Sequence, residues 1–483
     1  MTQKSGAQIS KKAFIQSFII LLTIMILAGV LTLVVPTGNY TRVAMEGREV
    51  IDPASFTLQP KLDYPIWRWF IAPFEVLGGP DGLTIIVIII FLMMVGAAFA
   101  VLDGSGILRA VIANIVARFG GRKYLLLAII SLFFMLLGAF FGIFEEVLPL
   151  VPIMIALSIY LGWDTLVGLG MSILAVNMGF SAAVTNPFTI GVSQKLAGLP
   201  LFSGSGLRVF FFAVIYVIFI WFLITYARKV EHKPDSSPVY QEDQEYKLHH
   251  PQFDLQQELS ADTKLKASLA WFGVFAALIL SVLVAAPFVS AITDYSLPIV
   301  ALLFLFGGLG AGFLSGKPAR AVWKAVLDGI MGIAPGILLI MMAASVKYIV
   351  VQGGILDTIL HSAAGVLAGA SAYGSSLIIY VLALAIEFFI GSGSAKAFLL
   401  MPILLPLGDL AGVTRQVVVT AYCFGDGFSN LIYPTNPVLL IALGLTVVTY
   451  SKWLRWSMKL WLFVVPVTLL FLALAVAIKF GPF

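Results

Sequence analysis

Isolated charged side chains interrupt several long apolar stretches of the sequence. Glu145 and Glu146 lie between apolar arms in GIFEEVLP, and Lys396 ends the glycine-rich stretch GSGSAK. Asp426 follows a glycine in GDGFS. An ionised group at membrane depth is costly unless it is paired or hydrated, so such positions are candidate ligand or ion sites. We expect the two glutamates to bind an ammonium or guanidinium group or carry a coupling proton, unless the turn is wet and they are simply solvated.

The other charges in apolar segments each have two interpretations. Lys396 can bind a substrate carboxylate or neutralise the two glutamates. Asp426 can bind a coupling cation or cap an interrupted helix. Lys347 and Glu387 are expected to be charges that face the helix bundle or snorkel to the interface, rather than substrate ligands.

A polar, helix-breaking phrase occurs twice in the chain. Residues 179–187 read GFSAAVTNP and residues 427–437 read GFSNLIYPTNP. Glycine and proline interrupt helical hydrogen bonding and free carbonyl groups that can hold a cation such as Na+. The half-helix N-termini favour a carboxylate. The candidate substrate ligands are Glu145, Glu146, Asn177, Ser181, Thr185, Asn186, Ser392, Gly393, Ser394, Lys396, Ser429, Asn430, Thr435 and Asn436, and the candidate coupling-ion ligands are Asp426, Asn186 and Asn436.

The composition is that of a polytopic membrane protein. Hydrophobic residues make up 60% of the 483 residues and charged residues 11%, with a mean hydropathy of +1.03. A soluble protein is roughly half apolar and about a quarter charged. The net charge of +5 does not indicate nucleic acid, because the basic residues flank apolar segments. A single cysteine, Cys423, excludes an internal disulfide and a cysteine-rich metal site.

Apolar segments of sufficient length predict the membrane crossings. The clear spans are about 13–35, 82–102, 207–227, 268–289, 296–315, 334–351 and 456–478. Two further crossings contain the repeated phrases and are predicted as broken helices at 164–196 and 414–449. The regions 124–162 and 375–412 are too long for one helix and have polar or glycine-rich middles, so we predict two re-entrant hairpins.

The distribution of basic residues supports this arrangement. With the N-terminus in the cytoplasm, most Lys and Arg residues fall inside, and the outer segment 354–372 has none. Most of the basic residues fall on the cytoplasmic side only if both hairpins enter and leave the membrane on the same side. The crossings, odd in number, then place the C-terminus outside.

A charged linker, 228–267, separates two similar halves, 1–227 and 268–483. The linker is poor in aliphatic residues, so we expect a cytoplasmic segment with little fixed structure and solvated histidines. Each half repeats the order of span, amphipathic segment, hairpin, broken helix and span. Because the first hairpin opens from the cytoplasm and the second from outside, the halves form an inverted repeat, which is typical of secondary transporters.

Paired re-entrant hairpins followed by TNP-bearing broken helices resemble the ion transporter superfamily. The segment order and the GFS…TNP phrases are similar to YfcC-type proteins, which are grouped with the anaerobic C4-dicarboxylate carrier family and resemble arginine/ornithine antiporters. The resemblance covers nearly the whole chain. It implies an all-α elevator: a transport domain with both hairpins and both broken helices slides against a scaffold that usually dimerises. Related transporters carry Ser-Asn-Thr at both hairpin tips, whereas here the tips read FEE (144–146) and SGSAK (392–396).

These features predict a symporter or antiporter in the cytoplasmic (inner) membrane, forming a homodimer and coupled to Na+ or H+. Like charges about 4 Å apart repel by roughly 4 kcal/mol at an effective dielectric of about 20, so the two glutamates disfavour a dicarboxylate. We therefore expect a small amino acid, including a basic one. A C4-dicarboxylate or other small carboxylate is the alternative, and an ion channel is the alternative from a different class. The chain has no HExxH or Walker motif, so no enzyme, cofactor, metal centre or nucleic-acid partner is expected.

Overall fold

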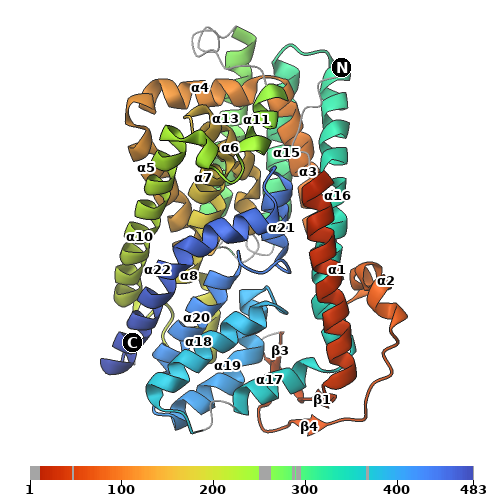
Figure 1. The fold of residues 1–483 in the computed structure, drawn as a ribbon, viewed down its shortest axis with the longest axis vertical. Coiled ribbons are helices and arrows are strands. Elements are labelled where there is room, and N and C mark those ends of the chain that lie inside the picture. Colours follow the sequence, from red (N-terminus) through yellow and green to blue (C-terminus); the bar gives the residue numbers. More distant parts are fainter. Residues whose placement is uncertain are drawn as a thin grey trace.

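The structure of the protein is a computed structural model that describes residues 11–45, 48–249, 263–285, 289, 295–365 and 369–481 (Figure 1). It is almost entirely α-helical. Within the described ranges, ten helical stretches are long and apolar enough to cross a membrane. The prediction of an all-α polytopic membrane protein is confirmed at this level.

One group of long helices is arranged about α3, which packs against α15 and α16, while α13 packs against α15 and α1 against α16. Glycines allow the backbones to approach closely: a Cβ on Gly308 would lie 2.8 Å from the Cβ of Ala98, and one on Gly329 would lie 2.2 Å from the carbonyl oxygen of Gly96. The helix predicted at 334–351 begins much earlier, because no strong helix breaker lies between Pro318 and that span. The members of this group are α1 (Lys11–Val34), α3 (Gly82–Gly104), α13 (Thr263–Ala285), α15 (Ser296–Leu314) and α16 (Ala319–Gln352).

Two helical hairpins lie at opposite ends of the second group of helices (Figure 1). Hairpin 1 consists of α5 (Lys123–Leu136) and α6 (Val151–Tyr160), joined by a π-helical turn (Leu137–Phe141) and a 3-10 segment (Glu145–Leu150). Hairpin 2 consists of α18 (Ala372–Glu387) and α19 (Gly393–Leu410).

A short helix precedes each hairpin and lies across one end of the molecule. Helix α4 (Ile107–Phe119) crosses the top of Figure 1, and α17 (Leu356–Gly365) crosses the bottom. The two hairpins are therefore entered from opposite ends of the protein.

The chain is interrupted at both repeated phrases. The first broken helix contains α7 (Thr165–Leu169), a π-helical turn (Gly170–Leu174), α8 (Ala175–Ala182), a second such turn (Pro187–Gly191) and α9 (Val192–Leu196). The second contains α20 (Arg415–Ser429) and α21 (Pro437–Gly444). We call residues 183–186 the first break and residues 430–436 the second break. Two long helices, α10 (Ser205–His232) and α22 (Tyr450–Ala477), pack alongside.

The segment between α1 and α3 forms a small cap beside α17. It contains two antiparallel strand pairs, β1 (Gly38–Asn39) with β4 (Thr57–Leu58) and β2 (Arg42–Met45) with β3 (Arg48–Ile51), followed by α2 (Trp67–Glu75). Asp357 of α17 fixes the cap, since its carboxylate accepts from the Tyr40 amide at 2.9 Å and pairs with Arg42 Nη2 at 2.8 Å.

The prediction of little fixed structure in the linker is wrong for residues 228–249. Helix α10 continues to His232, and α11 (Tyr240–His249) follows. The Asp243 carboxylate accepts from the Thr165 amide at 2.9 Å and from the Thr165 hydroxyl at 2.5 Å. These donors at the start of α7 need acceptors, and the linker supplies one. The His232 ring is exposed and contacts a backbone carbonyl of its own helix, while His250 lies outside the described residues.

Candidate functional site

The two broken helices touch each other through a glycine. A Cβ on Gly427 of α20 would lie 2.4 Å from the Cα of Ser181 on α8, so no side chain fits between them. Each broken helix also lies against the first arm of its own hairpin. A Cβ on Gly179 would meet the Met135 carbonyl oxygen at 1.8 Å, and a Cβ on Gly425 would meet the Tyr380 carbonyl oxygen at 2.5 Å. The hairpins and breaks therefore meet in one closely packed region.

Neutral hydrogen bonds hold the first break against hairpin 1. The Thr185 amide donates to the Ala139 carbonyl at 3.1 Å, and the Thr185 hydroxyl donates to the Phe140 carbonyl at 2.9 Å. Asn186 caps the next helical turn, since its Oδ1 accepts from the Phe188 amide at 2.9 Å. Gly142, at the hairpin tip, has a φ of 67° and packs against that same side chain. This contact leaves no room for a Cβ at the tip.

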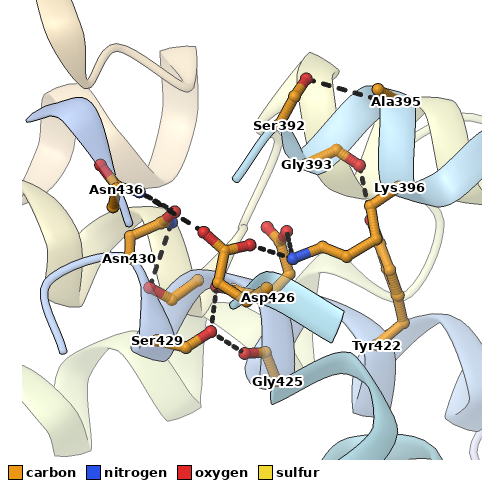
Figure 2. Close-up of polar contacts among 12 residues, drawn as sticks. Ser392, Gly393, Ala395, Lys396, Tyr422, Gly425, Asp426, Ser429, Asn430 and Asn436 are labelled. Carbon is orange, nitrogen blue, oxygen red and sulfur yellow. Dashed lines mark hydrogen bonds and ion pairs between the residues drawn. The ribbon is translucent and has the colours of Figure 1, made fainter. Parts of the chain in front are cut away.

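Charged side chains occupy the equivalent place in the second half. The Lys396 ammonium, from the first turn of α19, pairs with Asp426 Oδ1 of α20 at 2.9 Å. It also pairs with Glu387 Oε2 at the end of α18. The three side chains are at most 1% exposed. We call Glu387, Lys396 and Asp426 the buried triad; Figure 2 shows the lysine extended toward Asp426 between hairpin 2 and α20.

Two asparagines connect the buried triad to the second break (Figure 2). Asn436 donates from Nδ2 to Glu387 Oε1 at 3.4 Å and to Asn430 Oδ1 at 3.1 Å. Its Oδ1 accepts from the Val438 amide at 2.9 Å and so caps α21. Asn430 Nδ2 donates to the Gly427 carbonyl at 3.3 Å. The second break is thus hydrogen-bonded to hairpin 2 through Glu387.

The buried triad contains two carboxylates and one ammonium group. When all three are ionised, the triad carries one net negative charge. Apart from the ion pair with Lys396, neither Asp426 oxygen has a hydrogen-bond partner in the described part of the chain. Tyr422 donates its hydroxyl to the Gly393 carbonyl at 2.5 Å instead. Cys423, the next residue on α20, is also fully buried.

Several candidate ligands belong to this region. A Cβ on Gly393 would lie 2.9 Å from Asp426 Oδ2, which places the start of α19 against the triad. Gly393, Lys396, Asp426, Asn430 and Asn436 are therefore brought together. Buried polar atoms without a hydrogen-bond partner among the described residues include both amide atoms of Asn177, Nδ2 of Asn186 and the Thr435 hydroxyl.

Other candidate ligands have local roles. Ser181 donates to the Asn177 carbonyl at 2.7 Å and Ser429 to the Gly425 carbonyl at 2.8 Å, so both hydroxyls bond within their own helices. Ser392 caps α19 by accepting from the Ala395 amide at 3.5 Å. Ser394, two residues later, is half-buried.

The two glutamates of hairpin 1 are half-buried and lie apart from the charges of hairpin 2. Glu146 accepts from the Ser296 hydroxyl of α15 at 2.9 Å and from the Phe144 amide at 3.2 Å. The hypothesis that Lys396 neutralises them is wrong, because its ion pairs are with Glu387 and Asp426. Glu387 ends the first arm of hairpin 2 and Lys396 lies in the first turn of the second arm, so the turn of the hairpin itself brings the two side chains together.

Sequence reasoning gave Glu387 no ligand role, although it is a central residue of the site. Opposite charges on the two arms of one predicted hairpin were the available signal. Lys347 behaves differently, since it pairs with Asp81 at 2.7 Å with its side chain 29% exposed. Among the described residues, no group of three or more His, Cys, Asp and Glu side chains could hold a metal ion.

Comparison with known proteins supplies further findings. A model of the family described as C4-dicarboxylate anaerobic carrier matches residues 14–477. The chain is 30% identical over 469 residues to YfcC of Escherichia coli (strain K12), provisionally named a basic amino acid antiporter, with 91% of this chain and 92% of that protein covered. It is 25% identical over 377 residues to an uncharacterized protein of Haemophilus influenzae, covering 77% of this chain and 72% of the relative.

Two solved structures align over nearly the full length of the chain. One is the YdaH transporter of Alcanivorax borkumensis, at 19% identity and a TM-score of 0.43, covering 97% of this chain and 100% of that chain. The other is MtrF of Neisseria gonorrhoeae, from a class of antimetabolite efflux pumps, at 18% identity and a TM-score of 0.43, covering 95% of each chain. Likenesses at this level carry no information about substrate.

Proposed function

The chain belongs to the C4-dicarboxylate anaerobic carrier family, and from that premise we propose that it is a secondary active transporter for a small amino acid, with a basic amino acid as the favoured case. The observation that carries the proposal is that the buried triad holds two carboxylates for one ammonium group. A cation that entered this region would gain attraction in a place where water is excluded. Arginine and ornithine offer such a cation.

The hairpin 1 glutamates favour the same class of substrate. Glu145 and Glu146 add two carboxylates to the side of the protein on which α15 meets hairpin 1. YfcC, whose name refers to basic amino acids, is 30% identical to this chain over 469 residues. The carboxylate of an amino acid would find donors at the capped start of α19 or α21.

A C4-dicarboxylate is the alternative substrate, and the family description favours it. Lys396 would then bind one carboxylate of the substrate. For this to happen, Glu387 or Asp426 would have to take up a proton or be covered by a coupling cation such as Na+, because two carboxylates already surround the ammonium group.

We propose an elevator mechanism built on an inverted repeat. The opposite placement of α4 and α17 in Figure 1 supports the repeat. The glycine contacts at Gly179, Gly425 and Gly427 leave no room for sliding, which supports both breaks and both hairpins moving as one transport domain. The helices around α3 would form the scaffold and the homodimer interface. The proposed setting is the inner membrane, with the N-terminus inside and the C-terminus outside.

Uptake into proteoliposomes tests the proposal. Labelled arginine, ornithine, aspartate and succinate are offered with and without Na+, with and without a pH gradient, and with unlabelled compound inside. We expect saturable uptake of arginine or ornithine that internal substrate accelerates. Uptake of succinate alone would support the dicarboxylate alternative. An ion current without saturation or countertransport would instead support a channel.

Thermal unfolding offers an independent measurement that requires no reconstitution. A ligand stabilises the state it binds, so the transported compound should raise the Tm of the purified protein. Arginine and succinate are compared at equal concentration, with and without Na+. A rise with succinate and none with arginine would count against the amino-acid assignment.

A further inference from the structure

Arg208 of α10 lies against the first break, and in the described part of the chain only backbone carbonyls bond to its guanidinium. The residue is 1% exposed. Its Nε and Nη2 donate to the Val184 carbonyl at 3.2 and 3.1 Å, and Nη2 also donates to the Phe202 carbonyl at 3.2 Å. A buried guanidinium held by neutral groups is costly at membrane depth, so its position calls for a physical reason.

Both carbonyls belong to strained stretches of backbone. Ala183, directly before Val184, has a φ of 45°, and Phe202 has a φ of 58°. Among the described residues, Lys479 is the other non-glycine residue with a left-handed backbone. A Cβ disfavours this conformation, which persists only where the surroundings enforce it. The Arg208 side chain therefore bonds to the chain at two of these strained places.

The strain at Ala183 is located where α8 ends. The Ala183 amide donates to the Gly179 carbonyl at 3.2 Å, in the left-handed helix end that usually carries a glycine. The second broken helix ends differently, because Asn430, which follows α20, has a φ of −53°. The left-handed turn is thus particular to the first break, and Arg208 bonds to the carbonyl that follows it.

The left-handed turn sets the direction of Asn186, three residues later. Oδ1 of Asn186 caps the next helical turn, whereas its Nδ2 has no hydrogen-bond partner among the described residues. The side chain is fully buried. A buried amide donor without an acceptor costs free energy, and a carboxylate oxygen of a substrate would supply the acceptor.

We propose that Arg208 is a positioning residue of the transport site: it holds Ala183 in the left-handed turn and so directs the Asn186 amide toward a carboxylate oxygen of the substrate. This inference rests on the proposed transport function and deepens it. Arg208 acts through the backbone of the first break and does not itself touch the substrate. An amino acid and a dicarboxylate both carry a carboxylate, so Arg208 has the same role for either.

Arg208→Lys tests the role of the guanidinium, since it keeps a cation and loses the planar group that reaches two carbonyls. We expect the KM to rise roughly tenfold, as for the loss of one hydrogen bond to a charged group. The kcat should stay within about threefold of the wild type. Lys229→Met, at an exposed lysine of the same helix, is the control and should change neither constant. Proteoliposome uptake is measured with whichever of arginine, ornithine, aspartate and succinate the wild type transports.

Relief of the strain should rescue Arg208→Lys. Glycine adopts left-handed backbone without the Cβ penalty, so adding Ala183→Gly should return the KM to within about threefold of the wild type and raise the Tm. Ala182→Gly is the matched control, because Ala182 is equally buried but lies within the helical part of α8. It should rescue neither quantity. Phe202→Gly, at the other strained residue, should leave the KM of Arg208→Lys elevated.

A double-variant comparison tests whether the effect passes through Asn186. Asn186→Ser keeps an oxygen that can cap the next turn and loses the amide donor. If Arg208 acts through that donor, Arg208→Lys should raise the KM by no more than about twofold in the Asn186→Ser background. A further rise as large as that in the wild-type background would overturn the inference.

Two other results would also overturn it. Rescue by Ala182→Gly or Phe202→Gly as fully as by Ala183→Gly would make Arg208 a general brace of the fold. A fall in kcat at unchanged KM in Arg208→Lys would show that no binding group has moved. If Arg208→Lys does not fold, Ala183→Gly should restore folding and Ala182→Gly should not, and the absence of that difference has the same consequence. A wild-type protein that takes up none of the four compounds refutes the proposed function instead, a result that no pattern among the variants can imitate.

Discussion

The two breaks both end in Thr-Asn before a proline, and in both the asparagine caps the helical segment that follows. Asn186 accepts from the Phe188 amide and Asn436 from the Val438 amide, each at 2.9 Å. Their surroundings differ. Hydrogen bonds between neutral groups tie the first break to hairpin 1, whereas an asparagine in contact with Glu387 ties the second break to hairpin 2.

The difference suggests a division of roles, in which the first break positions the backbone and the second break also carries the charged groups. In the first half, Thr185 and Gly142 fix the backbone and leave the charges of the hairpin tip at the edge of the region. In the second half, the backbone path and the buried charges depend on each other. A change of substrate or of coupling should therefore follow from substitutions in hairpin 2 and α20 more readily than from those around the first break.

The largest effect is expected from Lys396→Met, which removes the ammonium group of the buried triad beside the second break. It leaves two carboxylates buried without a cation, which should destabilise the protein by about 3–5 kcal/mol and abolish uptake. Thermal unfolding and proteoliposome uptake measure the two consequences. Lys459→Met, at an exposed lysine of α22, is the control and should change neither. Uptake that survives Lys396→Met would mean that the triad is not part of the transport site.

A triple variant separates folding from function. Adding Glu387→Gln and Asp426→Asn to Lys396→Met removes every charge of the triad. Replacing a buried ion cluster as a whole is often neutral for stability, so the Tm should recover toward the wild-type value. Coupled exchange should not recover, because no charge remains to hold a cation.

The next largest effect compares the two hairpin tips. Gly142→Ala places a side chain at a φ of 67°, 2.2 Å from Asn186 Oδ1, and should destabilise the protein by about 2 kcal/mol or more. Gly391→Ala in hairpin 2 is the matched control, since its nearest atoms would be 3.6 and 3.7 Å away and the site is exposed. We expect its Tm to stay near the wild-type value. Equal losses would refute the view that only the first tip is locked by packing.

A smaller effect is expected where the two broken helices begin. Both helices have a cap within their own segment, since Asp164 accepts from the Val167 amide at 2.9 Å and Thr414 from the Val417 amide at 3.4 Å. At α7 the linker adds a further acceptor, Asp243. Asp243→Ala should lower stability by about 1–2 kcal/mol, measured by thermal unfolding, because the Thr165 donors lose a buried acceptor. Glu242→Gln, which affects a partly exposed pair with Lys452, should cost at most about 1 kcal/mol. If Asp243→Ala and Glu242→Gln lower the Tm by the same amount, the contact between Asp243 and Thr165 stabilises the protein no more than an exposed ion pair does.

The smallest effect is expected at the first hairpin tip. Glu145→Gln and Glu146→Gln should each raise the KM for a cationic substrate roughly fivefold, equivalent to about 1 kcal/mol, and leave folding intact. Uptake kinetics of arginine measure the change, with aspartate as the comparison substrate. Unchanged kinetics in both variants would remove the glutamates from the site and concentrate recognition in the second half.

The sequence predicted the apolar helices well and the contacts of the site less well. Long apolar runs identify helices such as α1 and α22 because burial in lipid or in a bundle requires them. The linker prediction failed because its polarity suggested solvation, while the structure uses Asp243 as an acceptor for donors at the start of α7. A contact between segments so far apart leaves no periodic signal.

The triad shows the same limit in detail. Lys396 and Glu387 lie on opposite arms of one hairpin, so their pairing follows from the turn and was within reach of the sequence. The pair with Asp426 depends on how α18 and α20 pack, for which Gly425 against the Tyr380 carbonyl supplies the close approach. A glycine in the sequence indicates that another segment packs closely against it, but it does not indicate which segment that is.

The burial of Cys423 makes the natural chain an unreactive background for thiol labelling. As the only cysteine, and with its thiol enclosed on α20, it should resist membrane-impermeant maleimides applied to either face of intact or inverted vesicles. Reporter thiols can be placed at Ala117 of α4 and Ser362 of α17, which are both exposed. If these helices lie on opposite sides of the bilayer, the two thiols will be modified from opposite faces of the membrane.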